Sequence, residues 1–134
     1  RPPWVTGYDD PENPTSLDRL MRLAGAETVE WPHKTECCGA SLSISNEDIV
    51  LKLVNRILQA ARQSGANCLV TACPLCHFNL DLRQQKCNKK LKTDYNMPVF
   101  YFTQLLGVAM GLDHKELCLN THYIDTRSIL KMVG

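Results

Sequence analysis

Apolar residues spaced three and four positions apart predict amphipathic helices along the chain. The clearest helix is expected between a capping box formed by Ser45 and Asp48 and a stop at Gly65. One face of this helix carries Val50, Leu53, Val54, Ile57, Leu58 and Ala61. Shorter helices are expected over residues 14–24, over residues 104–110 after a Thr103 cap, and after Asp125-Thr126.

Short apolar or β-branched runs between the helical segments predict strands at residues 28–31, 68–72 and 99–102. Pro74 follows the second run and opens a further helical pattern that reaches Leu82 and can continue to Lys90. Strands and helices therefore alternate. This order predicts an α/β fold with a small parallel sheet flanked by helices, in which ligand sites lie at the carboxyl ends of the strands.

Composition narrows the class of protein. A length of 134 residues predicts one domain over 1–134, and the formal net charge of +1 gives no reason to expect nucleic acid as a partner. No stretch approaches the roughly 18–20 apolar residues of a membrane span. Seven cysteines, an odd number, do not suit a secreted disulfide framework, so a cytoplasmic protein is expected. Because the chain begins with Arg1-Pro2-Pro3-Trp4, a loop-like stretch without an initiator methionine, we expect a fragment of a longer polypeptide.

Four of the cysteines form two tight pairs, each after an expected strand. Cys37 and Cys38 are adjacent, and a disulfide between neighbours is strained, so they are better suited to different metal atoms. Cys73 and Cys76 lie about one helical turn apart, as a shared metal or a reversible dithiol requires. Cys73 is also the expected N-cap of a helix, where the dipole favours a thiolate. Gly39 lets the backbone turn closely around an inorganic group and offers its N–H to a sulfur.

Three interpretations of the four cysteines are open. They could be small core residues, although packing does not require paired spacing. They could complete a tetrahedral zinc site, although zinc pairs usually leave two or more residues between ligands. An iron–sulfur cluster accommodates adjacent thiolates more easily, because each sulfur can bind a different iron, and it is the preferred hypothesis.

His77 could have a functional or a structural role, whereas the three remaining cysteines are expected to be structural. His77 could tune a cluster or deliver a proton to a leaving thiolate, and otherwise it is a surface histidine paired with Asp81 one turn on. The remaining cysteines lack partners at ligand spacing and are expected to be packing residues: Cys68, Cys87 and Cys118.

The cysteine motifs resemble a known family. Cys37-Cys38-Gly39, a spacer of 33 residues (40–72) and the run Cys73-Pro74-Leu75-Cys76-His77-Phe78-Asn79-Leu80-Asp81 look like the cysteine-rich CCG domain in the B subunit of heterodisulfide reductase. The segment 105–113, LLGVAMGLD, also resembles the closing part of that protein. The likeness covers nearly the whole chain.

The resemblance implies a function and a set of ligands. The family's B subunit carries two such domains, and this chain resembles the C-terminal one. In the family each domain can hold a noncubane [4Fe-4S] cluster, and a disulfide is cleaved between the two clusters. Cys37, Cys38, Cys73 and Cys76 would be four of five ligands, the fifth falling before Arg1. The implied partners are the N-terminal CCG domain, iron–sulfur subunits and a disulfide substrate such as that of coenzymes M and B.

Some related CCG domains are associated with zinc, so a zinc-stapled structural domain is an alternative. A thioredoxin-like dithiol oxidoreductase built on Cys73 and Cys76 is another, because it uses the same order of strand, CxxC and helix. The dithiol hypothesis leaves Cys37, Cys38 and Gly39 unexplained. The fragment by itself is expected to be inactive, with its cluster incomplete or lost, because the fifth ligand and the partner domain are missing from it.

Overall fold

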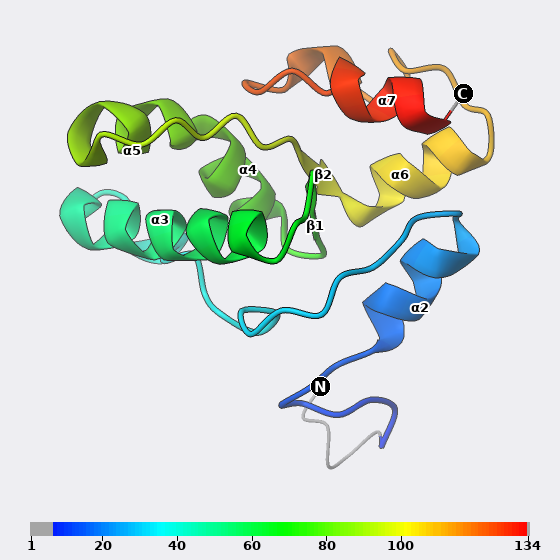
Figure 1. The fold of residues 1–134 in the computed structure, drawn as a ribbon, viewed down its shortest axis with the longest axis horizontal. Helices are drawn as coiled ribbons and strands as arrows, with labels where there is room; N and C mark the ends of the chain where they lie inside the picture. The colour runs from blue at the N-terminus through cyan, green and yellow to red at the C-terminus, as the bar shows by residue number, and fades with distance from the viewer. Residues whose placement is uncertain (1–6, 134) are drawn as a thin grey trace.

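The structure, a computed structural model, describes residues 7–133 and shows helices on both sides of a short parallel sheet (Figure 1). The loop expected at Arg1–Trp4 lies outside the described residues. The elements in chain order are α2 (Ser16–Leu23), the 3-10 helix η1 (Ala40–Leu42), α3 (Glu47–Gln63), β1 (Leu69–Thr71), α4 (Pro74–Leu82), α5 (Gln84–Leu91), β2 (Val99–Tyr101), α6 (Phe102–Ala109), the 3-10 helix η2 (Leu119–Thr121) and α7 (Arg127–Val133).

The sheet confirms the expected α/β class. β1 and β2 are parallel, with Leu69 opposite Val99 and Thr71 opposite Tyr101. The Leu69 N–H donates to the Pro98 carbonyl at 2.9 Å, one residue before β2 begins. Parallel neighbours need a crossover connection, and α4 and α5 supply it.

Two groups of buried side chains cover the sheet. The first joins α3, α5 and the sheet, and its fully buried members are Val50, Val54, Leu58, Cys87 and Val99. The second joins α2, α6 and α7 around the fully buried Phe100. The buried apolar stripe of α3 is the one that the sequence pattern predicts.

The prediction of a strand at residues 28–31 is wrong. These residues have no regular structure, because they lie across a cavity of about 1150 Å³ from β1, and a strand needs a hydrogen-bonded neighbour. Trp31 instead packs against the first core. Consequently only the second cysteine pair follows a strand.

The expected helix starts also need correction. Asn46, rather than a Ser45–Asp48 box, caps α3 by accepting the Ile49 N–H at 3.3 Å. α6 begins directly after β2, so Thr103 lies inside the helix, and the Gln104 side chain accepts the Tyr101 N–H at 2.9 Å. The pattern from Pro74 divides at Arg83 into α4 and α5. Asp125 precedes α7 as expected and accepts the Arg127 N–H at 2.9 Å.

Candidate metal centre

The second cysteine pair lies where the carboxyl end of β1 turns into α4. Cys73 is the N-cap of α4, and Pro74 stands at the helix start with its fixed φ. The Cys73 side chain is exposed. The nearby backbone N–H group of Cys76 and, less strongly, that of Leu75 hold the pKa of the Cys73 thiol below its usual value. This arrangement favours a thiolate at the mouth of the site, as the sequence predicts.

Cys76 is half-buried and connects the two pairs. Burial raises the pKa of its thiol to about 12, and the neighbouring thiols of Cys38 and Cys73 add to the rise. Cys76 packs against the core cluster that contains Cys38. The two cysteine segments therefore come close together, although residues 39–72 lie between them in the sequence.

The Cys37-Cys38-Gly39 segment is a tight loop that enters η1. Gly39 has φ +74°, and a Cβ there would lie 2.6 Å from Leu53 Cδ1 of α3. Its N–H donates to the Cys37 sulfur at 3.4 Å, which is the role expected for this glycine. Cys38 is 1% exposed, whereas Cys37 is exposed. The loop thus turns one thiol inward to Cys76 and leaves the other at the surface.

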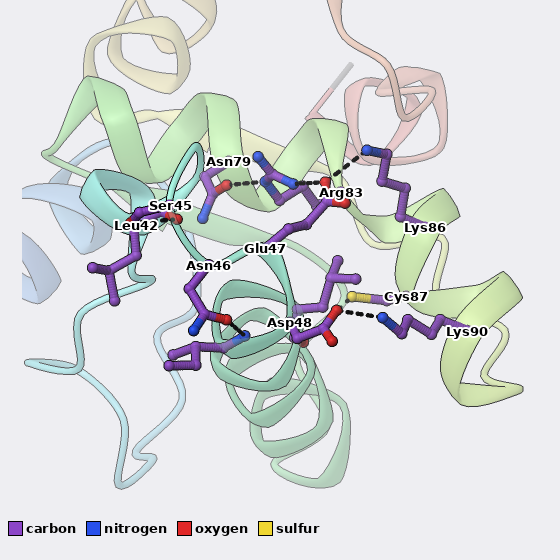
Figure 2. A network of polar contacts seen from close by, with 12 residues as sticks. Leu42, Ser45, Asn46, Glu47, Asp48, Asn79, Arg83, Lys86, Cys87 and Lys90 are labelled. Carbon is purple, nitrogen blue, oxygen red and sulfur yellow. Dashed lines mark hydrogen bonds and ion pairs between the residues drawn. The ribbon is translucent and has the colours of Figure 1, made fainter.

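A polar network ties this loop to α4 and α3, and Figure 2 shows the part of it that runs from Asn79 through Arg83 and Glu47 to Lys86. Asn79, 2% exposed, donates from Nδ2 to the Cys38 carbonyl at 3.0 Å. Arg83 donates from Nε to Asn79 Oδ1 at 2.5 Å and from Nη1 to Glu47 Oε1 at 2.6 Å. Lys86 also donates to Glu47, at 2.6 Å. The chain of contacts runs from the cysteine loop to the first turn of α3.

His77 points toward the sheet. Its Nε2 lies 3.1 Å from the Val99 carbonyl, which can only accept, so Nε2 carries the proton in this contact. The His122 ring meets it edge-on at 4.9 Å between centroids, and burial lowers the pKa of His122. The expected pairing of His77 with Asp81 is wrong, because the buried Asp81 carboxylate accepts the backbone N–H groups of Tyr123 and Ile124 at 2.8 and 2.9 Å.

The other cysteines divide into two kinds. Cys87 is fully buried and Cys68 packs against the second core, so the packing role predicted for them is confirmed. Cys118 is exposed at a positive φ of 54°, so that prediction is wrong for it. Within residues 7–133, no group of three or more His, Cys, Asp or Glu side chains has the geometry to hold a single metal ion. None of the helices described is long and apolar enough to cross a membrane.

Sequence reasoning missed Asn79, Arg83 and His122 as neighbours of the site. Asn79 stands within the motif that carries the family resemblance, which was the available signal. His122 comes from a segment without regular spacing, and tertiary contacts bring it beside His77: Asp81 binds the backbone of residues 123 and 124, and Gln104 Nε2 lies 3.0 Å from His122 Nε2.

These features define a small α/β cysteine-rich domain in which the Cys38 loop lies beside the Cys73–Cys76 segment at the end of a parallel strand. The chain belongs to the CCG family, described as "Cysteine-rich domain", which matches it over residues 5–81.

Three relatives extend the likeness beyond those residues. The chain is 35% identical over 96% of its length to the 8-methylmenaquinol:fumarate reductase membrane anchor subunit of Wolinella succinogenes. It is 33% identical over 99% of its length to the B subunit of the ferredoxin/F(420)H(2)-dependent CoB-CoM heterodisulfide reductase of Methanosarcina acetivorans. It is 30% identical over 81% of its length to a protein of Archaeoglobus profundus named as similar to the B subunit of heterodisulfide reductase. The chain spans 45%, 45% and 37% of the lengths of these relatives.

Proposed function

We propose that this chain is an electron-transfer domain of an oxidoreductase subunit, in which Cys37, Cys38, Cys73 and Cys76 bind an iron–sulfur cluster. The proximity of Cys76 to Cys38 and Cys73 carries the proposal, because it brings both motifs to one place in the fold. Thiolates are the ligands that such clusters use. The lowered pKa of Cys73 supports ligation, since a ligand must first be deprotonated.

The cysteines present fit a cofactor with several metal atoms, because their thiols lie both inside the fold and at its surface. Cys37 is exposed while its neighbour Cys38 faces inward, so adjacent ligands would bind different atoms of one cluster. When bound, such a cluster supplies single electrons and an iron that can accept a thiolate. The protein's contribution is to hold the thiols together, to offer the Gly39 N–H to a sulfur and to fix the His77 ring against Val99.

His77 is proposed to act near the cluster, because it follows Cys76 directly in α4. Its Nε2 is engaged with the Val99 carbonyl, so Nδ1 is the atom that remains to accept or give a proton. Proton delivery to a departing thiolate is the step that reductive cleavage of a disulfide requires.

A noncubane [4Fe-4S] cluster and a heterodisulfide substrate are the finer proposal, and the names of the Methanosarcina and Archaeoglobus relatives support them. The fumarate reductase relative shows that similar chains also occur outside that enzyme. We further propose that a second CCG domain and other subunits cover the site. Leu75 and Phe78, 61% and 55% exposed on either side of Cys76, support a covering partner.

A dithiol oxidoreductase is a second candidate that one observation favours. Cys73 is exposed with a lowered pKa while Cys76 is half-buried with a raised one, the asymmetry of a nucleophile and its resolving thiol. This function gives no role to the Cys38 contact with Cys76.

The test is metal and acid-labile sulfide analysis of anaerobically purified protein that contains this chain together with the fifth cysteine that the family resemblance implies, with a visible spectrum before and after dithionite. We expect about four irons per domain and absorbance that bleaches on reduction. One zinc without colour would make the domain structural. Protein without metal that forms a reversible Cys73–Cys76 disulfide would support the dithiol function and contradict the cluster.

A further inference from the structure

Asn79 is a buried amide whose two ends meet different segments. It lies in the last turns of α4, one helical turn after Cys76, and is 2% exposed. Nδ2 donates to the Cys38 carbonyl at 3.0 Å, and Oδ1 accepts from Arg83 Nε at 2.5 Å. A guanidinium only donates and a carbonyl only accepts, so the two partners determine which way the amide faces.

Arg83 is in turn held from outside the site. Its side chain is 11% exposed, and its guanidinium binds Glu47 at 2.6 Å in the first turn of α3. Glu47 also binds Lys86 of α5 at 2.6 Å. The view in Figure 2 shows Asn79, Arg83, Glu47 and Lys86 in sequence across these helices. Three helices therefore fix the position of one amide.

The Cys38 carbonyl needs this donor. The loop from Cys37 to Gly39 belongs to no strand, so no sheet ladder holds it. Cys38 is buried, and a buried carbonyl that loses its donor keeps the cost of desolvation. The Asn79 amide donates a hydrogen bond from α4 to the backbone of the cysteine loop.

We propose that Asn79, oriented by Arg83, is a positioning residue that holds the Cys38 loop against the CxxC helix and so sets the contact between Cys38 and Cys76. The role rests on the proposed function only in that both thiols belong to its site. It applies to the protein without metal as well, because every contact it uses is made between the chain's own atoms.

Two buried thiols allow this role to be measured without any metal. Cys38 reports on the loop, and Cys87, fully buried in α5 with its thiol 3.6 Å from the Leu51 carbonyl, reports on opening of the core. The experiment follows alkylation of each thiol by N-ethylmaleimide in metal-free, reduced protein, with the modified peptides counted by mass spectrometry. The quantity of interest is the Cys38 rate divided by the Cys87 rate.

The key variant is Asn79→Asp, which keeps the size of the side chain but places a carboxylate oxygen against the Cys38 carbonyl. We expect the ratio to rise about tenfold, because the loop opens while the core stays closed. Arg83→Lys keeps the positive charge near Glu47 but loses the Nε donor, and we expect a smaller rise of about threefold.

The matched control is Gln84→Leu, which removes another buried amide of the same region. Gln84 donates to the Leu80 and Met97 carbonyls and accepts the Met97 N–H, and none of these contacts involves a cysteine. This variant should raise both rates together and leave the ratio within about twofold, since its effect is on the whole fold.

An unchanged ratio in Asn79→Asp, or an equal change in Gln84→Leu, would overturn the positioning role. A loss of stability alone moves both thiols, so it cannot imitate the expected result. Iron analysis of the wild-type protein tests the proposed function independently of the alkylation experiment. The absence of a cluster would contradict the proposed function and would not affect the conclusion about Asn79.

Discussion

The two cysteine pairs of the proposed site are positioned by different means. Cys73 and Cys76 are delivered locally, by a strand that ends at Thr71 and a helix that starts at Pro74. Cys37 and Cys38 lie in a loop without a strand, and their position depends on a glycine at φ +74° and on an amide from another helix. One half of the site is therefore encoded in neighbouring residues and the other in distant contacts. The loop pair should be the easier one to displace.

The largest expected effect comes from Gly39→Ala. A Cβ at φ +74° is strained by about 1–2 kcal/mol, and here it also meets Leu53 Cδ1 at 2.6 Å. We expect the loop to shift and iron binding to fall to a small fraction of the wild-type level, measured by iron analysis after reconstitution.

Gly111→Ala is the matched control, because Gly111 has φ +78° and a Cβ added there would meet nothing within 4 Å. It should cost a similar strain of about 1–2 kcal/mol in urea unfolding while iron binding persists. Equal iron loss in both variants would show that Gly39 matters only for stability.

The next largest effect is a difference in the pH at which Cys73 and Cys76 are alkylated. In metal-free protein the pKa of Cys73 lies below its usual value, whereas that of Cys76 is about 12. Only the thiolate is alkylated, so as the pH rises Cys73 should react first and Cys76 should follow only in strong alkali. The check is iodoacetamide labelling at pH values from about 6 to about 10, in steps of about one unit. The masses of the modified peptides show which of the two cysteines is labelled at each pH. Simultaneous labelling would contradict the difference in environment.

The smallest effect is expected from Pro74→Ala at the start of α4. Pro74 adds about 0.4–1 kcal/mol to the free energy of unfolding, because proline restricts the unfolded chain. Its removal leaves Cys73 as the N-cap of α4. Thermal unfolding should shift slightly and iron content should stay at the wild-type level. A large loss of iron here would mean that the helical pair is no more robust than the loop pair.

The difference between the two cysteine pairs also explains which features could be predicted from the sequence. The α3 stripe, the β1–α4 junction and the Cys73 N-cap depend on periodicity and on residues next to one another, and they were predicted. The absence of a strand at 28–31 was not, because β propensity does not tell whether a neighbouring strand is present.

Within the site, the identities of the four cysteines came from motifs, whereas their arrangement required tertiary contacts. The Cys38 loop contacts Asn79 and lies against Leu53, which no local pattern marks as partners of the loop. His122 lies beside His77 through contacts that are distant in the sequence, from Asp81 to the following backbone and from Gln104 to the His122 ring.

The most direct test of a single shared site is iron analysis of two variants, one from each pair, after identical reconstitution. Cys38→Ser and Cys76→Ser should lose iron to the same extent, while Cys118→Ser, exposed and outside the motifs, should keep the wild-type content. If either of the first two retained its full iron, the two cysteine pairs would not hold one common group.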